Sequence, residues 1–189
     1  KNLYKNILSK VYKYYMKILA VQSRMGIGDT VIFLPFIKAL SKKFNSPISI
    51  LVKENSKANQ YLHHTKYIDK ILTLERDNKT NTRHGGFFGI FKLANDLKKY
   101  KFDKIFIFNS SLRFNLVAKI SGIPQIYQYP LFTKNKQHII EAPKKFLKKN
   151  LDLDINEDPE VQIDSDLIFK AAQKFQIDKN TKNILLGIG

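Results

Sequence analysis

The sequence predicts an α/β fold in which a parallel β-sheet is covered by helices on both faces. Short apolar runs, each long enough for one strand, alternate with longer segments whose apolar residues recur at helical spacing. Strands that alternate with helices are typical of βαβ units, whose crossover helices pack on the faces of a parallel sheet. The 189 residues suffice for one full domain and not for two large ones.

Five strands are predicted, each of them an apolar or β-branched run. They cover residues 18–22, 48–52, 68–74, 104–108 and 125–129. Helices are predicted between and after these strands, at residues 30–44, 56–63, 87–100, 111–120, 139–147 and 166–175. The polar segment 77–86, with its Gly-Gly pair, indicates a loop, and the acidic segment 152–164 indicates a linker.

The two ends of the chain differ from this central domain, which spans residues 18–164. Residues 1–17 predict a basic amphipathic helix, which either packs on the domain or lies in the headgroup layer of an anionic membrane. Residues 165–189 predict a linker helix and then a strand that runs into a glycine turn. We therefore expect 165–189 to lead into a second domain that the chain lacks.

Composition limits the classes of function. The net charge of +17 favours an anionic partner, such as nucleic acid, a membrane surface or a phosphorylated substrate. The absence of cysteine excludes disulfides, thiolate metal sites and a cysteine nucleophile. No apolar run approaches the roughly 20 residues that span a bilayer, and the N-terminus lacks the features of a secretory signal. We expect a cytoplasmic protein.

The segment 24–30, Arg-Met-Gly-Ile-Gly-Asp-Thr, joins the first strand to the first helix. Glycine lets a ligand approach the backbone, and a helix N-terminus favours negative charge. Gly26 and Gly28 match two glycines of the dinucleotide fingerprint, but Val31 occupies the third position. The nicotinamide interpretation is therefore weak, and no Walker-type phosphate loop is present either.

Asp29 in this segment has two interpretations. As the N-cap of the first helix it would stabilise the helix by about 1 kcal/mol. As a general base it would take the proton of a bound hydroxyl group. The residues alone favour the cap, because aspartate is a common N-cap and few aspartates are catalytic.

Ligands of open parallel sheets bind beyond the carboxyl ends of the strands. The segments that follow strands one, two, four and five are therefore expected to converge on one edge, and these are 24–30, 53–57, 109–113 and 130–138. His63 and His64 have no third ligand at a suitable spacing, so no metal site is predicted.

A series of short motifs occurs in a characteristic order along residues 18–189. They are 18–21, Arg24, Gly28-Asp29, Pro35, 38–40, 48–52, 67–69, Phe102-Asp103, 109–113, 118–124, His138 and the closing Leu186-Gly187. In this order and spacing the chain resembles the N-terminal half of family 9 glycosyltransferases, which include the lipopolysaccharide heptosyltransferases.

The resemblance implies a GT-B glycosyltransferase, in which two Rossmann-like domains face each other across a cleft. The first domain binds the acceptor, the second binds the nucleotide-sugar donor, and this chain resembles the first. The implied reaction is sugar transfer with inversion, without a metal ion or other cofactor. Asp29 matches the base that deprotonates the acceptor hydroxyl. The chain by itself is expected to be inactive, because the donor half is absent.

The resemblance also implies an acceptor site made of Gly28, Thr30, Lys53, Arg113 and His138. Basic residues of this domain would hold phosphates or acidic sugars. We expect the donor to be a nucleotide-diphospho-heptose and the acceptor to be an anionic glycolipid such as lipopolysaccharide core, reached at the inner membrane surface. Nucleic acid is not an expected partner. Ile107 and Ser110 depart from the family pattern, so the identity of the acceptor stays open.

Two rival hypotheses remain at this point. The chain could be a non-catalytic basic module that binds anionic membrane or nucleic acid, which explains the charge but leaves the Gly-Asp turn as a cap only. It could also be an inactive, truncated relative of the glycosyltransferases.

Overall fold

The computed structural model describes residues 16–24, 26–76, 82–131, 138–178 and 180–184. Residues 1–15 of the predicted N-terminal helix lie outside the described residues. The predicted closing strand lies there too, apart from its first residues, which form no strand.

The described residues form one five-stranded parallel sheet with the strand order β3-β2-β1-β4-β5. The strands are β1 Ile18–Val21, β2 Ile48–Lys53, β3 Ile68–Leu74, β4 Lys104–Ile107 and β5 Gln125–Gln128. β1 lies in the centre, where Ile18 is in register with Ile48 of β2 and Lys104 of β4. The strand predictions are confirmed to within one residue at each end.

The helices follow the strands in the predicted alternation. They are α2 Ile27–Phe44, the 3-10 turn η1 Glu54–Ser56, α3 Ala58–Tyr61, α4 Phe88–Lys98, α5 Leu112–Ile120, α6 Glu141–Leu151 and α7 Ser165–Lys174. The prediction of a single helix over 56–63 is wrong. Lys57 adopts the left-handed conformation with φ 52° and separates η1 from α3.

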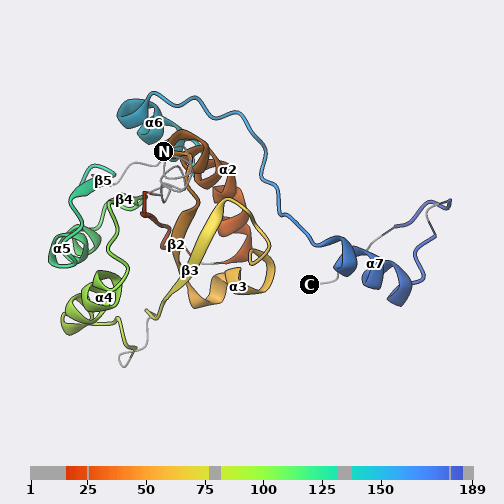
Figure 1. Ribbon diagram of the computed structural model, residues 1–189, viewed down its shortest axis with the longest axis horizontal. Coiled ribbons are helices and arrows are strands. Elements are labelled where there is room, and N and C mark those ends of the chain that lie inside the picture. The colour runs from red at the N-terminus through yellow and green to blue at the C-terminus, as the bar shows by residue number, and fades with distance from the viewer. Residues whose placement is uncertain (1–15, 25, 77–81, 132–137, 179, 185–189) are drawn as a thin grey trace, which may run out of the picture.

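Two apolar cores flank the sheet, one on each face. Helices α2 and α6 cover one of these faces, and α4 and α5 cover the other (Figure 1). Ile18 and Ala20 of β1 pack in the core beneath α2 and α6, while Leu19 and Val21 pack in the core beneath α4 and α5. A strand that is buried on both faces reads as a continuous apolar run, because its side chains alternate between two dry layers. The Rossmann-like arrangement with helices on both faces is confirmed.

The start of α2 differs from the prediction. The helix begins at Ile27 rather than at residue 30, and Gly26 precedes it with φ 106° and ψ 159°. This backbone conformation favours glycine. No side chain caps the helix, and Asp29 lies within its first turn. The prediction that Asp29 is the N-cap is therefore wrong.

The acidic segment 152–164 runs in extended form from α6 to α7 (Figure 1). Two sets of contacts bind this segment to the domain. Lys38 of α2 forms ion pairs with Glu157 at 3.2 Å and Glu160 at 3.5 Å. Farther along, the amide of Lys66 donates to Gln162 at 3.0 Å. Helix α7 follows, lies away from the sheet and has no buried residue.

Candidate functional site

A cavity of about 610 Å³ opens at the carboxyl edge of the sheet, where β1, β4 and β5 end. Part of its wall is aromatic, because the ring of Phe146 from α6 meets Phe108 at 5.3 Å and Tyr129 at 5.0 Å, both edge-on. The lining residues are Arg24, Phe108, Asn109, Ser110, Gln128, Tyr129, Pro130, Ala142, Lys145, Phe146, Lys149 and Asn150.

Among the described residues, every charged side chain that lines this cavity is basic. These side chains are Arg24 from the turn after β1 and Lys145 and Lys149 from α6. Within the described part of the chain, none of the three is paired with an aspartate or glutamate. Uncompensated cations around a concave surface favour an anionic ligand such as a phosphate or a carboxylate.

The polar side chains at the floor of the cavity bind other parts of the protein. Gln128 donates to the carbonyl oxygens of Asn109 and Ser111, at 2.9 Å each. The Asn109 amide donates to the hydroxyl of Ser23 at 2.6 Å. These bonds join the end of β5 to the loop after β4, and that loop to the turn after β1.

Tyr129 connects the aromatic wall to the cationic rim. Burial raises the pKa of the Tyr129 hydroxyl, and the nearby positive charge of Arg24 opposes this shift. The phenol therefore stays neutral at physiological pH and can donate a hydrogen bond beside a guanidinium group.

Asp29 lies on the same edge, in the turn that begins with Arg24. Its carboxylate lies over the glycine turn, since a Cβ atom on Gly26 would be 3.7 Å from Oδ2. Among the described residues, no hydrogen bond or ion pair to this half-buried carboxylate is present. The carboxylate is available to a ligand.

Gln22 holds the two ends of this turn together. Its buried side chain accepts a hydrogen bond from the amide of Arg24 at 2.7 Å and donates one to the carbonyl of Asp29 at 3.3 Å. No local pattern in the sequence indicates this role, because Gln22 is simply the last residue of the strand predicted at 18–22.

Gly28 and Thr30, the neighbours of Asp29, have different environments. Gly28 is exposed, and a Cβ atom placed on it would meet no atom within 4 Å. Thr30 is buried, and its hydroxyl donates to the carbonyl of Gly26 at 3.1 Å. Thr30 thus stabilises the turn from inside, while Gly28 leaves room for a ligand beside Asp29.

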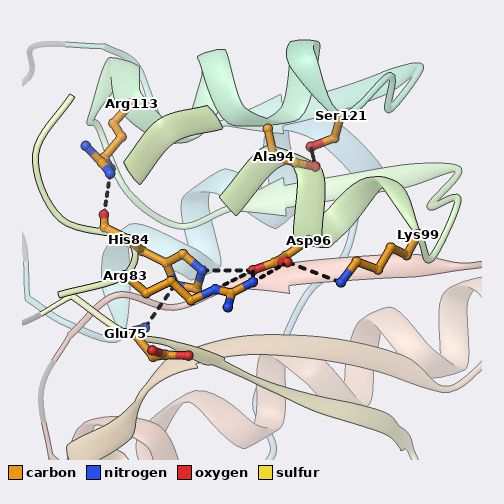
Figure 2. A network of polar contacts seen from close by, with 8 residues as sticks. All are labelled: Glu75, Arg83, His84, Ala94, Asp96, Lys99, Arg113 and Ser121. Atoms are coloured by element: carbon orange, nitrogen blue, oxygen red, sulfur yellow. Dashed lines mark hydrogen bonds and ion pairs between the residues drawn. The ribbon is translucent and has the colours of Figure 1, made fainter. Parts of the chain in front are cut away.

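Arg113 is not among the residues that line the cavity, and its side chain reaches the loop before α4 (Figure 2). Its guanidinium donates to the carbonyls of Gly86, at 2.7 Å, and His84. Burial lowers the pKa of Arg113, and the charge of Arg76 lowers it further. The guanidinium therefore holds the backbone of this loop, and the structure does not bring it to the cavity.

Lys53 and His138 do not line the cavity either. Lys53 ends β2 and is half-buried. His138 is exposed, and its Nδ1 accepts a hydrogen bond from the amide of Ile140 at 3.4 Å. Their acceptor-binding roles stay predictions. Lys145 and Lys149 line the cavity instead. Their four-residue spacing indicates a shared helical face, but the helix predicted at 139–147 ends before Lys149, whereas α6 continues to Leu151.

A second polar cluster joins the end of β3 to α4 (Figure 2). His84 is buried, its Nδ1 accepts from the amide of Glu75 at 3.1 Å, and its Nε2 faces Asp96 at 3.2 Å. Arg83 binds both oxygens of the same carboxylate, and Lys99 reaches it at 3.3 Å. The groups of this cluster satisfy one another, which indicates a structural role.

Metal and membrane features were sought in the same part of the chain. The described residues contain no group of three or more histidine, cysteine, aspartate or glutamate side chains that could hold a metal ion. None of the described helices is both long and apolar enough to cross a bilayer.

No protein-family model and no curated protein sequence matches the chain. Solved structures do resemble it. A family 9 glycosyltransferase from Veillonella parvula DSM 2008 superimposes with a TM-score of 0.65 and 19% identity, over 86% of this chain and 49% of that one. The Escherichia coli ADP-heptose lipopolysaccharide heptosyltransferase II gives a TM-score of 0.57 and 14% identity, over 87% of this chain and 52% of that one.

These likenesses concern the fold, because the sequence identities are low. The chain spans about half the length of both structures. The resemblance to family 9 glycosyltransferases, inferred from short motifs, is thereby confirmed in three dimensions. The chain has the Rossmann-like fold of one part of a larger glycosyltransferase.

Proposed function

We propose that this chain is the acceptor-binding half of an inverting glycosyltransferase. One observation carries the proposal: among the described residues, the carboxylate of Asp29 at the start of α2 has no partner, and the charged residues that line the cavity at the same sheet edge are basic. The fold shared with family 9 glycosyltransferases supports the same conclusion. A second domain would bind the nucleotide-sugar.

In this reaction Asp29 takes the proton of the acceptor hydroxyl as that oxygen attacks the anomeric carbon of the donor sugar. The bond between the anomeric carbon and the diphosphate breaks, and the nucleoside diphosphate leaves with the electron pair. Attack opposite the leaving group inverts the configuration. The exposed backbone at Gly28 leaves space for the acceptor beside the carboxylate. We propose further that no metal ion takes part.

The acceptor is an anionic glycan. Arg24, Lys145 and Lys149 would bind its phosphate or carboxylate groups, and the Tyr129 ring would contact a sugar face. A glycolipid of the lipopolysaccharide core fits this chemistry. The donor would be a nucleotide-diphospho-heptose, by analogy with the heptosyltransferase named for ADP-heptose. The proposed place of the protein is the cytoplasm, at the inner membrane surface.

The test is Asp29→Asn in the complete enzyme, which keeps the size of the side chain and removes the base. We expect transfer to fall by about 10²–10⁴-fold, the usual contribution of a general base, with an unchanged unfolding midpoint. Asp158→Asn, an exposed position in the linker, is the matched control and should keep full activity.

Radiolabelled or mass-resolved product formation measures the rate, with and without a chelator. A folded Asp29→Asn variant that retains more than about a tenth of the activity would contradict the role of Asp29. Loss of activity in chelator, restored by a divalent ion, would contradict metal independence.

A further inference from the structure

Helices α4 and α5 carry six large apolar side chains that are exposed to solvent. Three are phenylalanines at the start of α4, with exposed fractions of 69% for Phe87, 77% for Phe88 and 48% for Phe91. The other three are Leu112, Leu116 and Ile120 of α5, each between 37% and 44% exposed. We call these six residues the α4–α5 apolar face.

The six residues point away from the sheet, since other positions of the same helices form the core. Leu93 of α4 and Val117 of α5 are buried against the strands. Leu112, Leu116 and Ile120 recur every four residues, which places them in one stripe along α5. The Phe87 ring meets Phe88 at 6.0 Å and Phe91 at 5.7 Å, so the phenylalanines form one aromatic cluster on the surface.

The two helices pack against each other (Figure 1). Near one end, Arg113 of α5 donates to the carbonyl of Gly86 at 2.7 Å, just before α4. Near the other end, the hydroxyl of Ser121 donates to the carbonyl of Ala94 at 3.1 Å. These bonds fix the helices against each other, and the face is preformed.

The charges on the two helices are predominantly basic. Lys92 and Lys119 are exposed among the apolar residues. Asp96 is the acidic residue within these two helices, and Arg83, Lys99 and His84 already hold its carboxylate. The face therefore combines exposed aromatic rings with cations that no neighbouring carboxylate on these helices offsets.

We infer that the α4–α5 apolar face docks on an anionic lipid bilayer. The transfer of exposed aromatic and aliphatic side chains from water into the boundary between headgroups and acyl chains is favourable. Each basic residue close to an anionic membrane surface strengthens membrane binding by about 1 kcal/mol. Exposed apolar side chains on helices that also carry the exposed Lys92 and Lys119 suit such a surface better than they suit an uncharged partner, and the net charge of +17 acts in the same direction.

Docking in this way would bring the sheet edge that holds Asp29 near the membrane. α4 follows the loop that leaves the carboxyl end of β3, so Phe87 and Phe88 lie toward the same sheet edge as Asp29. A lipid-linked acceptor could then reach the carboxylate without leaving the bilayer. This last step rests on the proposed function, whereas membrane binding itself can be measured without any donor or acceptor.

The experiment measures binding of the full chain to vesicles of phosphatidylcholine, alone or mixed with phosphatidylglycerol. We expect binding to the mixed vesicles only, and a loss of about tenfold or more in the double variant Phe88→Ser, Phe91→Ser. The matched control is Phe169→Ser, Phe175→Ser, which removes two comparably exposed rings, one on α7 and one just after it, and should bind as the parent does.

Three outcomes would overturn the inference. The first is equal vesicle binding by the parent and the Phe88, Phe91 variant, both shown to be folded by circular dichroism. The second is equal binding to neutral vesicles. The third is a dimer of the parent in solution that becomes monomeric in the same variant. In that case a second copy of the chain, and not a membrane, would cover the face. Asp29→Asn should bind vesicles normally, so a failure of the proposed function would be seen separately.

Discussion

Two glycine-containing junctions at the same sheet edge have opposite character. At the start of α2, Gly28 faces open space and Asp29 has an unpaired carboxylate among the described residues. At the start of α4, Gly89 is pressed against the backbone of His84, and most polar groups around it bind one another (Figure 2). Nε of Arg113 is the exception, since it is buried without a hydrogen-bond partner among the described residues. The carboxylate at the first junction has no partner among the described residues, whereas the carboxylate and the histidine at the second junction are bound by the protein.

The comparison teaches that composition alone does not identify a site. The α4 junction contains histidine, aspartate and arginine, which are common catalytic residues. The amide of Glu75 can only donate, so Nδ1 of His84 must accept, and the proton lies on Nε2 toward Asp96. A histidine with both nitrogens engaged by the protein serves the fold. The α2 junction is poorer in polar groups but leaves them available to a ligand.

At the junction before α4, substitution of Gly89 should cause the largest loss of stability. A Cβ atom there would overlap the His84 carbonyl carbon and oxygen and lie 2.8 Å from Nη2 of Arg113. Since backbone is the obstacle, relief requires movement of the loop or of α4. We expect Gly89→Ala to destabilise the protein by about 3 kcal/mol in urea unfolding. A loss below about 1 kcal/mol would mean that the junction is much looser than described.

Asp96→Asn should weaken the same junction by about 1.5 kcal/mol at neutral pH. The buried His84 accounts for most of this, because ion pairs with exposed partners such as Arg83 and Lys99 contribute little. Burial opposes ionisation of Asp96, but hydrogen bonds from His84, Arg83 and Lys99 outweigh it and lower the pKa of the carboxyl.

The lowered pKa fixes the pH dependence. The stabilisation by Asp96 is fully present above the unfolded-state pKa of 3.8 and is lost as the pH falls through the lower folded-state value. Urea unfolding from about pH 5 down to about pH 2 should therefore show a steeper loss of stability for the parent than for Asp96→Asn. Parallel curves for the two proteins would contradict this assignment.

At the start of α2, Gly28→Ala should raise the stability of the protein slightly, by up to about 1 kcal/mol. Alanine favours the helix, and its Cβ atom would meet no neighbour within 4 Å. In the complete enzyme the same methyl group would occupy acceptor space and raise KM for the acceptor. Thermal unfolding and kinetics on one preparation measure both effects. Unchanged KM in a stabilised variant would indicate that the acceptor does not approach Gly28.

The layout of the fold could be predicted because its signals are local. Most strands are short apolar runs bounded by polar residues, and the long helices have apolar residues at helical spacing, so both kinds of element are visible in short windows of the sequence. The predicted start of α2 was wrong because it assumed that a polar side chain caps the helix. In the structure Gly26 precedes the helix with a positive φ, and no side chain caps it.

The site was less predictable, since it depends on which side chains meet in space. The turn with Gly28 and Asp29 was found because glycine and an acidic residue beside a helix start are visible in sequence. Arg113 reaches the loop at Gly86 and not the cavity, and this contact joins residues that are far apart along the chain. Lys145 and Lys149 reach the cavity only because α6 packs beside the ends of β4 and β5.

The central place of β1 has a consequence for how the chain folds during synthesis. β1 pairs with β2 within about thirty residues, but its other partner, β4, follows only some eighty residues later. Until β4 has emerged from the ribosome, one edge of the most apolar strand offers free amide and carbonyl groups to any other chain. The abundant lysines would repel a second copy during this interval, so the charge that suits an anionic ligand would also protect the nascent protein.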